Sequence, residues 1–185
     1  MLVNPYAGLG GSVALKGSDG VQTREEALRR GATPQAPGRM SRALKALSAV
    51  SNVSVVTWGG DMGENSCRAA KVPCTVIGES PMPSSPDDTR AAAAALKAAG
   101  AELILFAGGD GTARDLVDAI GLGTPVLGVP AGCKMHSAVY AVNPEAAGSL
   151  LAELAGGGLV ALESAEVRDI DEAAFREGVV KARHY

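Results

Sequence analysis

Aromatic residues are scarce in this chain of 185 residues, since Phe, Trp and Tyr together make up 3% of it. This scarcity argues against the stacking surfaces on which single-stranded nucleic acids bind. The net charge is −3, so a basic surface for nucleic acid is not expected either. No apolar run approaches the roughly 18 residues that a membrane span needs. The first residues also lack the basic and apolar regions of a secretory signal. Neither nucleic acid nor a membrane is therefore expected as a partner.

Cysteine is also rare. The chain has three cysteines, Cys67, Cys74 and Cys133. Their number is odd and their spacing is not that of a metal site, which is typical of a reduced cytosolic protein. Hydrophobic residues make up 46% of the chain and charged residues 20%, which is enough apolar material for a packed core. The composition thus predicts a soluble, cytoplasmic globular domain.

Glycine, by contrast, is abundant. The chain has 24 glycines in 185 residues, a share of about 13% against a usual share of about 7%. They follow no collagen-like period and form no Gly/Ser linker. We therefore expect them to serve turns and loops.

The clearest alternation of elements lies between residues 85 and 127. Ser85, followed by a proline and two aspartates, predicts the start of a helix that stops at Gly100. The apolar segment Leu103–Ala107 comes next and has no polar alternation, which is expected of a strand buried on both faces.

A second helix and strand follow in the same order. Thr112 and Asp115 fit a capping box for a helix that ends at Gly121, and Pro125–Val129 is another short buried strand. This α–β–α–β order with short connections is typical of a parallel sheet covered by helices. The predicted fold class is α/β: a Rossmann-like parallel sheet with helices on both faces.

Further elements are predicted along the rest of the chain. The expected strands are Leu2–Val3, Val53–Trp58, Cys74–Ile77, Leu159–Val167 and the segment that opens at Val179. The expected helices are Thr23–Arg30, Met40–Ala49, Asp61–Lys71, Pro144–Ala155 with Asn143 as its cap, and Asp171–Glu177, with a turn region over Gly31–Gly38.

The segment Gly108-Gly109-Asp110-Gly111-Thr112 carries the clearest chemistry. It lies between the end of a buried strand and the start of a helix, where open α/β sheets bind ligands. Glycines let the backbone approach phosphate oxygens, and the N–H groups of the following helix attract anions. A carboxylate there is suited to accept a proton from a substrate hydroxyl or to hold a magnesium ion. The alternative is a tight turn whose aspartate caps the helix.

A second glycine-rich loop begins at Asn4 and contains Gly8, Gly10 and Gly11. It also follows a predicted strand, and its backbone is able to wrap phosphates. Asn4 is placed to hydrogen-bond across the loop and fix its shape. The alternative is an ordinary surface loop, in which the nearby Lys16 is solvated rather than bound to a phosphate.

The third loop runs from Val129 to Ser137. Its Lys134 is suited to neutralise phosphate charge. His136 and Ser137 are expected to line the same pocket, although a lone histidine is more often structural. No acid is placed for a hydrolase triad. The carboxyl ends of parallel strands meet at one edge, so we expect the three loops to converge.

Together these segments resemble the ATP-NAD kinase family, in particular the bacterial branch that includes acetoin-catabolism X-type proteins. Gly-Gly-Asp-Gly-Thr alone is also shared with diacylglycerol and sphingosine kinases. The set is more specific, and its members come in family order. They are Val3–Gly11, Leu15–Gly20, Phe106–Asp115 and Gly128–Ser137.

The resemblance implies transfer of a phosphoryl group from ATP, or from polyphosphate, to the 2′-hydroxyl of NAD, which gives NADP. Mg²⁺ would accompany the phosphate donor. Asp110 matches the family aspartate that deprotonates or orients that hydroxyl. Positions that match the family's phosphate-binding loops are Asn4, Gly8, Gly10, Gly11, Gly108, Gly109, Gly111 and Thr112, and Lys134 belongs to the third loop.

The sequence also departs from the family pattern. Members carry a second, mainly β domain with an Asn-Glu pair, and this sequence has no Asn-Glu dipeptide. The first strand is expected to be clipped before Leu2 and the second domain to be truncated at Tyr185. We therefore expect residues 1–158 to form the α/β nucleotide-binding domain and residues 159–185 to begin the C-terminal region.

Two alternatives to a working kinase follow from these departures. One is a nucleotide-binding or regulatory module that lacks turnover without its second domain, and the other is a lipid kinase of the diacylglycerol kinase type. An apolar surface left where the second domain belongs would favour a homo-oligomer.

Overall fold

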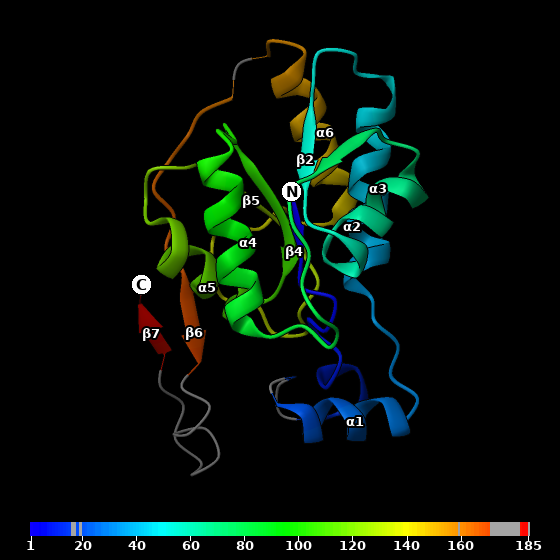
Figure 1. Ribbon diagram of the computed structural model, residues 1–185. Coiled ribbons are helices and arrows are strands. Elements are labelled where there is room, and N and C mark those ends of the chain that lie inside the picture. The colour runs from blue at the N-terminus through cyan, green and yellow to red at the C-terminus, as the bar shows by residue number, and fades with distance from the viewer. Residues whose placement is uncertain (16–17, 19, 159, 171–181, 185) are drawn as a thin grey trace.

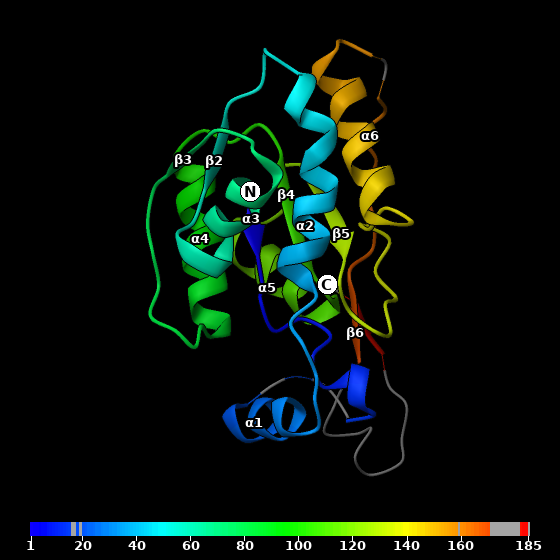
Figure 2. The same cartoon turned by 90° about the vertical axis from the view of Figure 1, so that its right-hand side faces the viewer.

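Parallel strands between two layers of helices form the body of the protein (Figures 1 and 2). The computed structural model describes residues 1–15, 18, 20–158, 160–170 and 182–184. Its central strands are β1 (Leu2–Val3), β4 (Ile104–Gly108) and β5 (Val126–Pro130), which pair in parallel in the order β1-β4-β5.

A second pair of parallel strands lies beside β1. β2 (Val55–Thr57) pairs with β3 (Cys74–Val76) as a separate two-stranded sheet. The Thr57 hydroxyl donates to the Met1 carbonyl at 3.1 Å, and the Met1 ammonium donates to the Val56 carbonyl, so β2 lies beside β1. The parallel strands, with helices on both faces of β1-β4-β5, have the arrangement of a Rossmann-like α/β fold. The predicted fold class is confirmed.

The two faces of β4 bury different side chains, because successive residues of a strand point to opposite sides. Leu105 and Ala107 face one core, and Ile104 and Phe106 face the other. The first core is covered by α2 (Ala36–Leu44), α3 (Glu64–Ala70) and α6 (Pro144–Ala155), and the second by α4 (Pro86–Ala98) and α5 (Asp110–Ile120). A strand buried on both faces explains why Leu103–Ala107 carries no polar residue.

The predicted starts of α4 and α6 are confirmed. Ser85 Oγ accepts a hydrogen bond from the Asp88 N–H at 3.3 Å, and Asp88 Oδ2 accepts one from the Ser85 N–H at 2.8 Å. The Asn143 side chain accepts from the Ala146 N–H at 2.8 Å. These caps satisfy N–H groups that the helix itself leaves without partners.

The capping box predicted at Thr112 and Asp115 is wrong. α5 begins at Asp110 with Gly109 as its N-cap, and no side chain caps it. Thr112 Oγ1 instead accepts from Asn4 Nδ2 at 2.9 Å, and Asp115 pairs with Arg90 at 2.6 Å. Partners from distant parts of the chain have displaced the local arrangement that the spacing indicated.

Other helices differ from the prediction mainly at their ends. α2 starts at Ala36 rather than Met40, since Pro37 is tolerated in a first turn, and 3₁₀ turns cover Lys45–Ala49, Gly60–Met62 and Gly11–Val13. α1 (Val21–Arg29) replaces the predicted Thr23–Arg30 and lies apart from the sheet, beside the loop after β1 (Figure 2).

The C-terminal part contains a small antiparallel pair, β6 (Arg168–Ile170) and β7 (Ala182–His184). The strand predicted over Leu159–Val167 is wrong for residues 160–167, which are irregular. Most of these residues are exposed and do not pack on a strand of the sheet, so no neighbouring strand among the described residues holds them extended. The helix predicted over Asp171–Glu177 lies outside the described residues.

Removing the cap of α4 tests its local contribution to stability. Ser85→Ala is expected to lower the free energy of unfolding by about 1 kcal/mol, because the Asp88 N–H loses its partner. Urea unfolding followed by circular dichroism measures this change. Ser149→Ala, at an exposed position within α6, is the control and should change stability by less than about 0.5 kcal/mol. Equal effects of the two variants would contradict the capping role.

Candidate functional site

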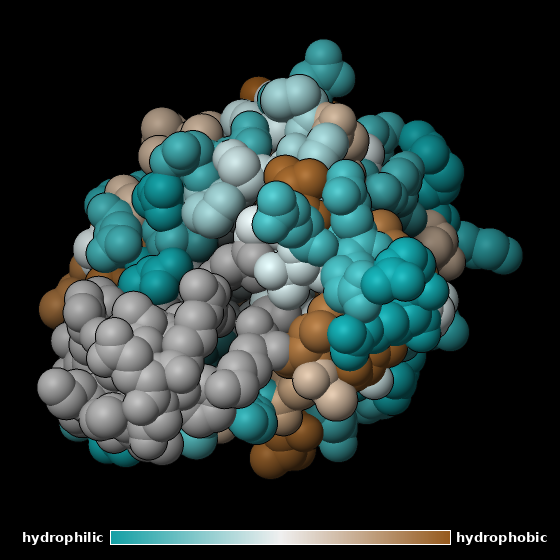
Figure 3. All heavy atoms as spheres, turned by 90° about the horizontal axis from the view of Figure 1, so that it is seen from below, coloured by the Kyte–Doolittle hydropathy of each residue, from teal (hydrophilic) through white to brown (hydrophobic). Residues whose placement is uncertain are grey.

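Three loops meet where the parallel strands end, at the lower edge of the sheet in Figure 1. We name them the first loop (residues 4–15, after β1), the second loop (residues 108–112, after β4) and the third loop (residues 131–137, after β5). Seen from below, this face has pale residues of near-neutral hydropathy in its hollowed middle, with hydrophilic side chains beside them (Figure 3). The convergence predicted from the strand ends is confirmed.

The first and third loops approach each other closely enough to exclude side chains. Gly8 has a φ of +74°, and a Cβ atom there would lie 2.1 Å from the Ala131 carbonyl oxygen. A Cβ at Gly11 would lie 2.6 Å from Cys133 Sγ. Cys133 Sγ is also 3.5 Å from the Gly8 carbonyl oxygen. Glycine is therefore required at both positions for this contact.

The second and third loops are joined mainly through the backbone. The Ala131 N–H donates to the Gly108 carbonyl at 2.9 Å, and a Cβ at Gly132 would lie 3.2 Å from Gly109 Cα. Tyr140 supports the pair, because its hydroxyl donates to the Gly109 carbonyl at 2.6 Å. The Tyr140 ring packs 5.3 Å from that of Phe106, centroid to centroid, so the hydroxyl is fixed by the core.

Asn4 joins the first loop to the second. Its backbone N–H donates to the Ala107 carbonyl at 2.9 Å, and its Nδ2 donates to Thr112 Oγ1 at the same distance. Its Oδ1 accepts from the Tyr6 N–H at 3.1 Å, which shapes the turn. The cross-loop bond expected of Asn4 is present. Thr112 is 2% exposed and supports the loops from behind rather than lining them.

The Asp110 side chain lies between the second and third loops, and the residue is 6% exposed. Its Oδ2 accepts from the His136 N–H at 2.7 Å, and its Oδ1 accepts from the Ser137 N–H at 3.1 Å. Hydrogen bonds to a carboxylate are stronger than neutral ones, so these amides hold the side chain in one orientation. Each oxygen retains acceptor capacity for a further donor.

The first turn of α5 adds a positive field to the same place. No side chain caps it, and the Gly111 position is half-buried at the loop edge. Uncapped N–H groups and the helix dipole favour a negatively charged ligand there. Gly108, Gly109 and Gly111 thus lie together in the backbone around Asp110.

Among the described residues, the cations on or next to these loops include Lys134 and Arg39. Lys134 is exposed on the third loop, where the sequence predicted it. Arg39, from the first turn of α2, donates through Nη1 to the Pro130 carbonyl at 2.8 Å and is half-buried. Sequence reasoning missed Arg39, because it lies next to the segment predicted as a turn. The sequence signal that could have identified Arg39 is its position at the start of α2, the first helix in the chain that packs on the sheet. Lys16 lies outside the described residues.

A family model for the ATP-NAD kinase N-terminal domain matches residues 2–159. The chain belongs to the ATP-NAD kinase family. The match includes all three loops and Asp110, so the resemblance seen in the motifs is confirmed at the level of the family. Neither the curated proteins nor the solved structures searched gave a match.

A second buried carboxylate of this ATP-NAD kinase domain, Asp115, has a structural setting. Its partners are Arg90 at 2.6 Å and Arg114 at 3.5 Å. Burial raises the pKa of Asp115, while the two guanidinium groups oppose that shift. Because Arg90 comes from α4 and Asp115 from α5, the pair joins these helices behind the second loop.

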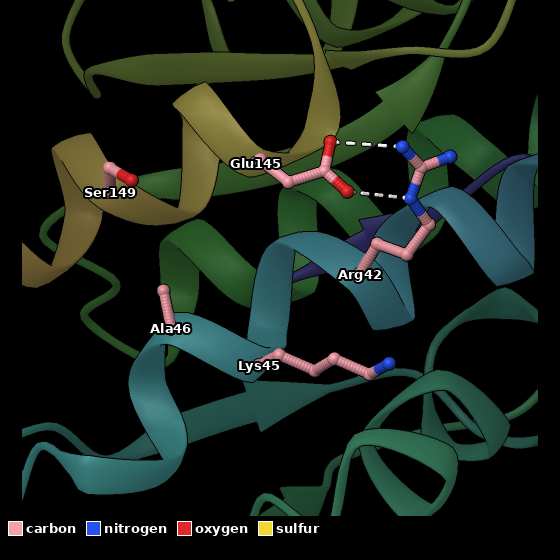
Figure 4. Close-up of a pocket in the computed structure, with 5 residues that line it drawn as sticks. All are labelled: Arg42, Lys45, Ala46, Glu145 and Ser149. Carbon is pink, nitrogen blue, oxygen red and sulfur yellow. Dashed lines mark hydrogen bonds and ion pairs between the residues drawn. The ribbon is translucent and has the colours of Figure 1, made fainter.

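A hollow of about 520 Å³ lies between α2 and α6, on the helical layer that covers one face of the sheet (Figure 4). Its lining residues are Arg42, Lys45, Ala46, Glu145 and Ser149. Arg42 donates to both Glu145 oxygens, at 2.7 and 2.9 Å, and these contacts also hold the pKa of Glu145 below its usual range. None of the residues predicted for the site lies there, so this hollow is not the candidate site of the kinase domain.

In the part of the chain that the structure describes, no group of three or more His, Cys, Asp or Glu side chains is gathered to hold a metal ion. None of the helices in this part has the length and apolarity to span a bilayer. The candidate site of this family member contains backbone N–H groups, the Asp110 carboxylate and nearby cations.

The contact between the first and third loops can be tested by adding one methyl group. Gly8→Ala should lower the free energy of unfolding by about 2 kcal/mol or more, because both strain at positive φ and a clash with Ala131 arise. Gly100→Ala is the matched control, since Gly100 has a φ of +81° but open space around its Cβ position. Denaturant unfolding compares the two, and a Gly8 effect no larger than the Gly100 effect would contradict the close approach.

Proposed function

We propose that this domain binds a phosphate donor and NAD at the three loops and supports phosphoryl transfer to the 2′-hydroxyl of NAD, which gives NADP. The observation that carries the proposal is the Asp110 carboxylate. It is buried, is held by two backbone amides, and lies at the uncapped first turn of α5. Phosphoryl transfer depends on positioning and charge neutralisation more than on covalent chemistry, and these loops offer both.

In this proposal the backbone binds the phosphates. Gly8 and Gly11 of the first loop and the glycines of the second have no side chains that would block the approach of a phosphate. The Gly10 N–H donates to Ser18 Oγ at 2.9 Å, so Gly10 contributes to the shape of the first loop. Lys134 and Arg39 neutralise charge from the third loop and from α2. ATP and polyphosphate share the phosphate chemistry that such a surface recognises, and the geometry favours neither.

Mg²⁺ enters as part of the donor. The described residues form no carboxylate cluster that would hold it on their own, and magnesium usually keeps most of its waters and binds through substrate phosphates. When bound it neutralises charge on the transferred group. Asp110 remains free to act on the acceptor.

The reacting proton goes to Asp110. As the 2′-oxygen of NAD forms its bond to the terminal phosphorus, the bond from that phosphorus to the bridging oxygen of the donor breaks, and ADP leaves when the donor is ATP. The hydroxyl proton passes to the free acceptor position of the Asp110 carboxylate, which must lie within hydrogen-bond reach of it. The amides of His136 and Ser137 keep that position directed toward the loops.

Asp110→Asn tests the proposed base. The amide keeps the shape but cannot take the proton, so the rate of NADP formation should fall by about 10²-fold or more. Binding of Mg-ATP and of NAD should stay within a few-fold, because the backbone supplies most contacts. An enzymatic NADP assay and calorimetric titration measure these two quantities. Unchanged turnover in the variant would remove Asp110 from the mechanism.

The wild-type assay also separates the proposal from its rivals. NADP formed by the wild-type chain and lost in Asp110→Asn supports the kinase. Binding of nucleotide without NADP formation supports a binding module that lacks turnover. Phosphorylation of a diacylglycerol, offered in mixed micelles in place of NAD, supports a lipid kinase.

Cys133 provides a test of nucleotide binding that needs no turnover. Its side chain is exposed at the junction of the first and third loops, whereas Cys74 lies at the start of β3, away from the loops. A donor bound at ten times its Kd should slow alkylation of Cys133 by iodoacetamide about ten-fold, in proportion to occupancy. Peptide mass spectrometry follows both thiols, and Cys74 serves as the internal control. Equal rates at Cys133 with and without Mg-ATP would place the donor elsewhere.

A further inference from the structure

Ser137 connects Asp110 to a strand that lies outside the three loops. Its N–H donates to Asp110 Oδ1 at 3.1 Å. Its hydroxyl donates to the Arg168 carbonyl at 3.0 Å and accepts from the Arg168 N–H at 3.0 Å. Ser137 is 8% exposed, so both the donor and the acceptor capacity of its hydroxyl are used in a buried setting.

The backbone around Ser137 is held from both sides. The Gly128 N–H of β5 donates to the Val139 carbonyl at 2.8 Å, and the Ala141 N–H donates to the Gly128 carbonyl at 2.9 Å. On the other side, the Ala138 N–H donates to the Glu166 carbonyl at 2.9 Å. Val167 is 3% exposed and packs in the core beneath α5. Residues 137–141 therefore lie between β5 and the start of β6.

We propose that Ser137 is a positioning residue, through which the start of β6 sets the orientation of the Asp110 carboxylate. The hydroxyl fixes Ser137 to the Arg168 backbone, and the N–H groups of His136 and Ser137 then fix both carboxylate oxygens. Displacement of the Arg168 segment would release these amides together. The position of β6 thus regulates the site, and the catalytic part of this inference rests on the proposed function.

The side chains of the third loop do not provide the same control. Lys134 and His136 are exposed, and it is the backbone N–H of His136 that reaches Asp110. Loss of the Ser137 hydroxyl removes this partner from two backbone groups of Arg168 in a partly buried place, which costs free energy. The third loop would then open more often, although the N–H groups that bind Asp110 are still present.

Hydrogen exchange measured by NMR tests this coupling without any activity. In Ser137→Ala the amide protons of His136 and Ser137 should exchange about ten-fold faster than in the wild type, the effect of losing a buried hydrogen bond on local opening. Ser137→Thr retains the hydroxyl and should restore slow exchange. Ser149→Ala is the matched serine control, and the amides of β4 report global stability.

Two outcomes would overturn the inference. One is unchanged exchange at His136 and Ser137 in Ser137→Ala, and the other is an equal acceleration at every amide, β4 included. If Ser137→Ala does not fold, Asp110→Asn decides instead. An amide oxygen accepts more weakly than a carboxylate, so exchange at His136 and Ser137 should speed up more than exchange in β4, and unchanged exchange at these two amides would overturn the clamp.

Turnover separates this inference from the proposed function. If the wild type forms NADP, Ser137→Ala should lower kcat about ten-fold, with KM for the donor within about two-fold, because orientation rather than binding is lost. Ser137→Thr should restore kcat, and an unchanged kcat in Ser137→Ala would refute the catalytic part. If the wild type forms no NADP, the proposed function fails while the exchange result still decides the positioning role.

Discussion

The close approach of the three loops at one edge of the sheet is the constraint on which the site depends. Gly8 lies against the Ala131 backbone and Gly11 against the Cys133 side chain, and neither place has room for a further carbon atom, while a Cβ at Gly132 would lie 3.2 Å from Gly109 Cα. Parallel strands bring their carboxyl ends to the same edge, but they do not by themselves bring the following loops into contact. The loops can touch because glycines at the contact points have no side chains. This contact gives one structural reason for the abundance of glycine in the sequence.

The chemistry of the site follows from the same arrangement. The positive field at the start of α5 favours the negative charge of the Asp110 carboxylate, and the amides of His136 and Ser137 hold that carboxylate in one orientation. The third loop reaches Asp110 only because Gly132 lets it pass close to Gly109. Backbone N–H groups therefore offset the negative charge of Asp110, and the cations Lys134 and Arg39 lie at the border of the site.

Local signals in the sequence predicted the fold well, and distant contacts explain what they missed. The Ser85 cap and the buried strand at Leu103–Ala107 depend on residues near them in the chain, and both were predicted. Asn4 and Thr112 are 108 positions apart, and their hydrogen bond removed Thr112 from the predicted capping box. The roles of Arg39 and Ser137 likewise depend on partners 91 and 31 positions away. The spacing of residues along the chain does not predict such long-range pairs.

A site assembled from backbone contacts is sensitive to the length of its loops as well as to the identity of Asp110 and of the glycines. Substitution of Lys134 or His136 leaves the backbone N–H groups in place. One inserted residue, by contrast, lengthens the backbone of the loop by about 3.8 Å, which exceeds the donor–acceptor distance of a hydrogen bond. Insertions within the three loops would shift the amides away from Asp110 in a single step. Divergent copies of this domain should thus accumulate their length differences elsewhere, such as in the exposed connection around Gly31 or in the irregular stretch before β6.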